Sequence, residues 1–148
     1  MPMVQPLHPP SRIDPATLEA YLATDYHILS EPPFIVKVGQ FSQELSALHH
    51  RLHAASSALL TACNPCSRLL SEEENQRRQW CLLESIKEAG IPFITARGED
   101  PQRQWPAENS LLLLGIEQQT AIKLGQKWQQ NALLWHGHDA VPLLLLLR

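Results

Sequence analysis

The length, composition and charge of the chain limit what it can be. Its 148 residues suit one domain, and 44% hydrophobic with 18% charged residues is the balance of a folded globular chain. The net charge of -3 disfavours nucleic acid as a partner, because a negative field repels phosphates. No apolar run approaches the roughly 20 residues of a membrane helix, so we expect no membrane partner either.

The N-terminal segment holds four prolines within its first eleven residues. This predicts a flexible tail over residues 1–12, followed by a single α/β domain over residues 13–148. The segment lacks the apolar stretch of a signal peptide, so we expect a cytoplasmic protein. Three cysteines are an odd number, and in a reducing compartment they do not predict a disulfide framework.

Capping residues and hydrophobic periodicity predict the helices and strands. Asp14, Ser42 and Ser71 are expected helix N-caps, and Gly90 ends the helix that Ser71 begins. β-rich segments between turn residues predict strands. In chain order we expect a helix at 14–23, strands at 26–29 and 34–38, a helix at 42–52, a strand at 57–62, a helix at 72–89, strands at 91–96 and 110–115, a helix at 117–129, and strands at 131–136 and 141–147.

This order predicts an α/β fold, with α+β as the alternative. We expect a single mixed sheet of five to seven strands with three to four helices. Strand 57–62, the next helix and strand 91–96 form one β-α-β crossover, whose strands are parallel. If strand 110–115 then runs antiparallel, helix 117–129 returns the chain to the edge where both crossover strands end.

Polar residues from separate segments converge at that edge. They are Asn64 and Ser67 after the first crossover strand, Arg97, Trp105 and Glu108 in the loop at 97–109 after the second crossover strand, and Gln130 and Asn131 after the last helix. Ligands bind outside the carboxyl ends of parallel strands in open α/β sheets. The convergence therefore predicts a ligand site.

The hypothesis for this site is a small-molecule or nucleotide-like ligand. Asn64, Ser67, Gln130 and Asn131 would supply neutral hydrogen bonds, Arg78 or Arg97 would hold an anionic group, and Trp105 would stack on the ligand or close the pocket. Asn75 would contact the ligand's polar edge. Glu108 is the candidate general acid or base, which fits hydrolysis or group transfer.

Each of these residues also has a structural interpretation. Asn64 and Asn75 are suited to binding the local backbone and tying the loop to the following helix. Trp105 can cap the core, and Glu108 can form an ion pair with Arg78 or Arg97. The Gln130-Asn131 pair can close a helix.

Cysteine and histidine allow two further hypotheses. Cys63 and Cys66 have the spacing of a redox pair, but the expected helix starts near Ser71, too far on to lower a thiol pKa. They could also join His49, His50, His53, His136 or His138 in a zinc site. We place His49 and His53 on the solvated side of their helix, and we expect neither a metal nor a cofactor.

Three pieces of the chain resemble a known family. They are TACNPCS at residues 61–67 with Ser71 and Asn75 following, Gly98 with WPAE at 105–108, and QNA at 130–132. In this order they resemble the bacterial family catalogued as domain of unknown function 3293, over residues 21–147. The resemblance supplies no activity, and the family pattern does not require the cysteines of this segment. It implies that the family pattern is built around the polar residues gathered at the edge.

A non-catalytic interaction module is the rival hypothesis. The leucine run at 143–147 must be buried on both faces, either by the chain's own helices or by a second subunit. A homodimer through this strand, or a protein partner on the 98–109 loop, would fit that hypothesis.

Overall fold

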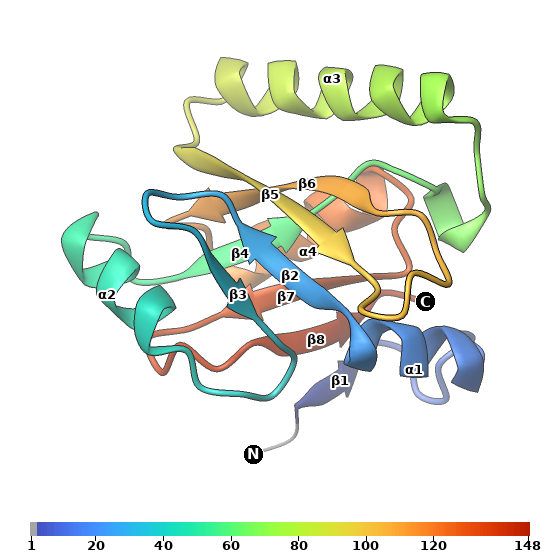
Figure 1. Ribbon diagram of the computed structural model, residues 1–148, viewed down its shortest axis with the longest axis horizontal. Coiled ribbons are helices and arrows are strands. Elements are labelled where there is room, and N and C mark those ends of the chain that lie inside the picture. The colour runs from blue at the N-terminus through green and yellow to red at the C-terminus, as the bar shows by residue number, and fades with distance from the viewer. Residues whose placement is uncertain (1–2) are drawn as a thin grey trace.

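One mixed sheet of eight strands organises the computed structural model, which describes residues 3–148 (Figure 1). The strand order is β1-β8-β7-β4-β6-β5-β2-β3. The strands are β1 (Val4–Pro6), β2 (Asp25–Ile28), β3 (Phe34–Val36), β4 (Ser57–Leu60), β5 (Phe93–Glu99), β6 (Glu108–Leu114), β7 (Ala132–His136) and β8 (Leu143–Leu146). The α-helices are α1 (Pro15–Ala23), α2 (Gln43–Arg51), α3 (Glu72–Glu88) and α4 (Gln118–Lys127).

The mixed α/β character and the helix number agree with the prediction, whereas the expected range of five to seven strands was too low. The additional strand is β1, in the segment that we placed in a flexible tail. It pairs in parallel with β8, and Leu7 N donates to Leu146 O over 2.9 Å. Pro6 is tolerated because an edge strand leaves some of its N–H groups unpaired. The part of the tail prediction that concerns residues 1–2 lies outside the described residues.

The expected crossover and return are both present. β4 and β5 are each antiparallel to β6, so they run in the same direction, with β6 between them. β7 is antiparallel to β4. The chain therefore returns through α4 to the edge where β4 ends, which brings the start of β7 beside the loop that follows β4.

The predicted caps form in the structure. Thr17 N donates to Asp14 Oδ1 over 2.9 Å, Leu45 N donates to Ser42 Oγ over 3.0 Å, and Glu74 N donates to Ser71 Oγ over 3.1 Å. Each bond satisfies an N–H group that the first turn of a helix leaves free. Among the helices within residues 3–148, none has the length and hydropathy that a membrane span requires.

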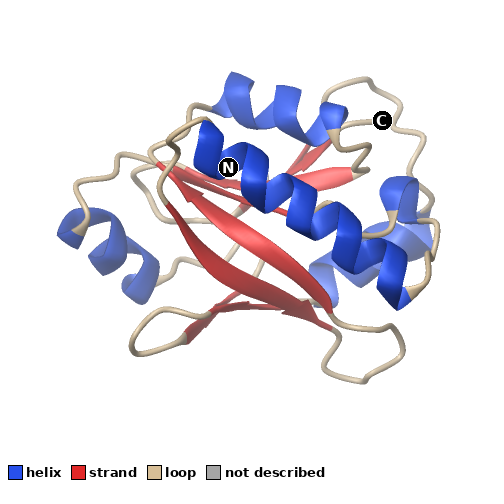
Figure 2. Ribbon diagram, turned by 90° about the horizontal axis from the view of Figure 1, so that it is seen from above, coloured by secondary structure: helices blue, strands red, loops and turns tan. Residues whose placement is uncertain are grey.

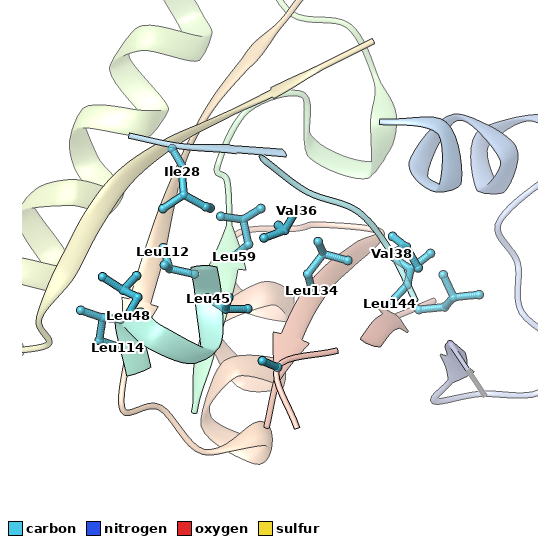
Figure 3. Close-up of a cluster of buried hydrophobic side chains, with 13 residues drawn as sticks. Ile28, Val36, Val38, Leu45, Leu48, Leu59, Leu112, Leu114, Leu134 and Leu144 are labelled. Carbon is cyan, nitrogen blue, oxygen red and sulfur yellow. The ribbon is translucent and has the colours of Figure 1, made fainter. Parts of the chain in front are cut away.

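The helices cover the two faces of the sheet differently. α3 and α4 cover one face side by side (Figure 2), and Leu82 and Ile122 pack there into one buried apolar cluster. On the other face the sheet curls, so that Ile28 and Leu144 share a second cluster (Figure 3). α1 and α2 lie at opposite ends of this concave face (Figures 1 and 2).

The chain itself buries the leucine run of β8. Leu144 and Leu146 belong to the cluster on the concave face, whereas Leu145 and Leu147 belong to the cluster under α3 and α4. β1 and β7 pair with the two edges of the strand. The apolar sequence that suggested a homodimer is therefore explained within one chain.

Candidate functional site

A cavity of about 390 Å³ lies at the α1 end of the concave face. The other end is filled by Leu45 and Leu48 of α2, which are buried in the core cluster (Figure 3). The cavity is lined by α1, by the loops after β4 and β5, and by side chains of the sheet. Its size is within the range typical of small-molecule sites, roughly 300–1,000 Å³.

Glu108 is an acidic side chain that lines this cavity. It is the first residue of β6, and its Oε2 accepts a hydrogen bond from Asn64 Nδ2 over 2.5 Å. Burial raises the pKa of the Glu108 carboxyl above its ordinary value, although the bond from Asn64 acts in the opposite direction. The carboxyl is therefore easier to protonate than that of an exposed glutamate, which suits a group that exchanges protons with a ligand.

Asn75 fixes the side chain that holds Glu108. Its Nδ2 donates to Asn64 Oδ1 over 2.8 Å, and its Oδ1 accepts from Asn64 N over 2.8 Å. Leu70 N also donates to Asn64 Oδ1, over 2.9 Å. Because Oδ1 of Asn64 is occupied twice as an acceptor, its Nδ2 must face Glu108. Asn75 does not line the cavity and positions Asn64 instead.

Ser110 is a buried hydroxyl on the cavity wall. It follows Glu108 by two residues on β6 and therefore projects from the same face of the sheet. Only 7% of the residue is exposed, and its Oγ has no hydrogen-bond partner among the described residues. Buried polar groups are nearly always hydrogen-bonded in folded proteins, so this hydroxyl requires an explanation.

A second polar group lies on the α1 side of the cavity. Tyr21 OH and Ser67 Oγ are 2.9 Å apart, and Asn131 Nδ2 donates to Ser67 Oγ over 2.7 Å. Arg148 Nη1 holds Asn131 Oδ1 over 3.3 Å. Tyr21 and Ser67 carry two hydroxyl hydrogens, and their mutual bond uses one. The second hydroxyl hydrogen has no acceptor among residues 3–148 and is available to a ligand.

The loop after β4 has a strained backbone. Asn64, Cys66 and Ser67 have positive φ angles of 48°, 53° and 60°, and Gln129 on the neighbouring segment has one of 59°. Asparagine adopts this conformation readily, whereas cysteine, serine and glutamine do so at a cost of roughly 1–3 kcal/mol each. The bond from Cys66 N to Gln129 O, at 2.7 Å, ties the two strained segments together. Such strain clusters at functional sites.

The structure brings together most of the residues that the sequence assigned to the site. The cavity is lined by Asn64, Ser67, Trp105, Glu108 and Gln130. Asn131 donates a hydrogen bond to Ser67, and Asn75 donates one to Asn64, without lining the cavity. Gln130 Nε2 donates to Cys63 O over 3.1 Å and to Trp128 O over 3.2 Å. Trp105 is 49% exposed and stands at the rim with Leu69, which is 72% exposed.

The two expected anion-binding arginines lie outside the cavity. Arg97 precedes Gly98, which lines the cavity, so strand alternation turns Arg97 to the opposite face. There its Nε donates to Glu99 Oε1 over 2.9 Å. Arg78 Nε donates to Ala62 O over 2.6 Å, and its Nη2 donates to Trp128 O over 2.8 Å. Arg78 therefore joins two loops, and neither arginine forms an ion pair with Glu108.

The cysteines do not have the environment of a redox pair. Cys63 is buried, and burial raises the pKa of its thiol, whereas an attacking thiolate needs a lowered pKa. Its Sγ lies 3.7 Å from Asn109 O. Within residues 3–148, no cluster of three or more His, Cys, Asp or Glu side chains is placed to hold a metal ion.

The expected solvated position of His49 was wrong. His49 is buried, its Nε2 lies 2.7 Å from Ser57 Oγ, and the same oxygen lies 2.9 Å from Nδ1 of His136. Burial lowers the pKa of both imidazoles, that of His136 to about 3. Ser57 is fully buried and does not line the cavity, so this chain of three side chains belongs to the core.

Sequence reasoning missed two parts of the site. Tyr21 was missed because no sequence signal says that α1 closes the cavity. Ser110 could have been found, because strand alternation places it on the same face as Glu108. Its position at the start of a leucine run is the signal that would have identified a buried polar group.

The fold and the cavity define a mixed α/β protein whose sheet is hollow at one end. Residues 60–133, half of the chain, match the family described as a protein of unknown function, DUF3293. The chain therefore belongs to this family, which confirms the resemblance seen in the sequence. No curated protein and no solved structure gives a significant match.

Proposed function

We propose that the cavity binds a small organic molecule, with Glu108 as the acid or base of the site. The observation that carries this proposal is Ser110, whose buried hydroxyl has no partner among residues 3–148 and lies beside Glu108 on the cavity wall. A ligand that bonded to Ser110 would satisfy a group that the protein alone leaves unsatisfied.

Acid–base chemistry is the reaction type that the proposal favours. A carboxyl whose pKa is raised by burial is suited to exchange a proton with a bound substrate. Asn64 and Asn75 fix its position, as a catalytic group requires. Hydrolysis or group transfer would fit this single carboxyl, and the free hydroxyl hydrogen of the Tyr21–Ser67 pair could orient a substrate.

The lining makes a phosphate-bearing ligand unfavourable. Among the described residues, no lysine, arginine or histidine lines the cavity. A nucleotide would therefore place its phosphates near Glu108 without a compensating cation. The uncharged or positively charged parts of small metabolites suit the site better.

A fragment screen would test the proposal, with ligand-detected NMR and thermal shift as readouts. Gly98→Val should narrow the cavity without disrupting the fold, because a Cβ at Gly98 would meet Thr24 and Tyr26 at an ordinary 3.6 Å. Thr95→Val is the matched control, since Thr95 is exposed on the same strand and does not line the cavity.

We expect fragments that bind the wild type and Thr95→Val but not Gly98→Val. Hits that bind all three proteins equally would place the site elsewhere. A screen without hits would overturn the ligand proposal and favour the alternative, a non-catalytic protein-interaction module.

A further inference from the structure

The charged side chains that line the cavity are all acidic. Three of the lining side chains are carboxylates and three are aromatic, and no cationic side chain of the described residues joins them. The carboxylates belong to Asp14, Asp100 and Glu108, and the aromatic rings to Tyr21, Tyr26 and Trp105. The whole chain also carries a net charge of -3. An organic cation would be attracted to such a site, and an anion would be repelled.

One cation, Arg148, reaches the polar group on the α1 side only through an intervening residue. Arg148 donates to Asn131 Oδ1, and Asn131 in turn bonds to Ser67 on the α1 side. The guanidinium does not line the cavity and forms no ion pair with Glu108 among the described contacts. The carboxyl of Glu108 therefore has a neutral partner, Asn64, and no counter-charge.

The hydrogen-bonding groups deep in the cavity can accept hydrogen bonds, so they suit a ligand that donates them. Oε2 of Glu108 is bonded to Asn64, and Oε1 has no partner within residues 3–148. Ser110 Oγ, two residues further along the same face, can also accept. A protonated amine offers several N–H donors and needs no donor in return. The aromatic rings and the leucines of the sheet would contact its apolar part.

The geometry points to an amphipathic organic amine as the ligand class: a protonated primary or secondary amino group beside Glu108 and Ser110, carried on an aromatic or aliphatic body that extends towards Trp105. This inference rests on the proposed function. It is independent of whether Glu108 performs acid–base chemistry, because it concerns only which head group the site prefers.

Three indole probes with one body and different head groups would test the inference. Tryptamine carries an ammonium group, tryptophol a hydroxyl and indolepropionate a carboxylate. Dissociation constants would be measured at neutral pH by calorimetry and ligand-detected NMR. Because a hydrogen bond between two charged groups is stronger than one between neutral groups, we expect tryptamine to bind at least about tenfold more tightly than tryptophol, and indolepropionate to bind most weakly.

Two variants would assign the preference to named side chains. Glu108→Gln keeps an oxygen that can accept from Asn64 but removes the charge, so it should abolish the preference of tryptamine over tryptophol. Ser110→Ala should weaken the binding of every probe that binds the wild type. Gly98→Val should remove binding of each probe, which excludes attraction of the amine to acidic groups elsewhere on the surface.

The possible failures are distinguishable. Equal affinities, a preference for indolepropionate, or an amine preference that survives in Glu108→Gln would overturn the amine inference and leave the cavity proposal standing. Failure of all three probes to bind would also overturn it. The proposed function would then be decided separately by the fragment screen, which contains acids and neutral molecules as well as amines.

Discussion

The side-chain amide of Asn64 donates to the carboxyl of Glu108 over 2.5 Å, and Asn75 holds this amide in one orientation. The three residues come from the loop after β4, the start of β6 and the first turn of α3. The bond joins positions 44 residues apart in the sequence. It therefore links the position of the acidic group to the packing of α3 on the sheet.

Replacing Glu108 by Gln should stabilise the protein at neutral pH. The pKa of this carboxyl is raised in the folded state, so the carboxylate destabilises the fold once the pH exceeds the unfolded pKa near 4.5. Glutamine keeps an acceptor for Asn64 and carries no charge. We expect a higher free energy of unfolding than in the wild type at neutral pH, and the difference should shrink as the pH falls towards the unfolded pKa.

Urea unfolding of both proteins across this pH range would measure the effect. The exposed Glu88, in the last turn of α3, provides a control, and Glu88→Gln should change stability little. A loss of stability in Glu108→Gln at neutral pH that disappears in acid would show that the fold favours the carboxylate over its neutral form, and would contradict the raised pKa.

Asn75→Ala should destabilise the loop after β4. It removes the partner of Asn64 N and one of the two donors to Asn64 Oδ1. Leaving such groups without partners costs about 1–3 kcal/mol. Gln76→Ala, at the neighbouring exposed position of α3, changes no such contact and should be close to neutral. Equal stability of the two variants in thermal and urea unfolding would contradict a positioning role for Asn75.

Gly125 of α4 packs closely against two leucine side chains. A Cβ at this position would lie 2.5 Å from Leu147 Cδ1 and 2.9 Å from Leu133 Cδ2, both of which are buried. Gly125→Ala gains about 1 kcal/mol in helix propensity, but overpacking costs about 1–3 kcal/mol. We expect net destabilisation in urea unfolding, whereas Gln126→Ala on the exposed side should stabilise slightly. A more stable Gly125→Ala protein would show that the two leucines move aside freely.

Local chemistry predicted much of this fold. Asp14, Ser42 and Ser71 cap helices where expected, because each N-cap bond depends only on residues within one turn. The antiparallel direction of β6 was also predicted, and from it followed the position of Gln130 at the cavity. β1 was missed because its pairing with β8 is a contact across the whole chain and leaves no periodic signal in three residues.

The sequence predicted the loops that form the site, but not all of the side chains that line the cavity. Arg97 was placed in it because the strand was expected to end at Ala96, with the site loop at 97–109, whereas the strand continues to Glu99. Alternation along these extra strand residues turns Gly98 into the cavity and Arg97 away from it. Tyr21 could not be assigned, because the packing of α1 against the end of the curled sheet depends on tertiary contacts.

The buried His49–Ser57–His136 chain should make the fold sensitive to acid. The pKa of His136 is lowered to about 3 in the folded protein, because burial disfavours the charged imidazole. Below the unfolded value of 6.5 the unfolded chain takes up a proton that the folded chain excludes. Stability is therefore fully present above that pH and is lost as the pH falls, by about 1.4 kcal/mol per pH unit for this residue.

His136→Phe removes this proton uptake and should reduce the slope of unfolding free energy against pH between about pH 4 and about pH 6. The carboxylates that also titrate in acid are the same in both proteins, so the difference between the two slopes isolates the histidine. Ser57 keeps His49 as a partner in the variant, over 2.7 Å. Parallel slopes would contradict the prediction. They would mean that His136 accepts the proton in the folded protein as readily as in the unfolded chain.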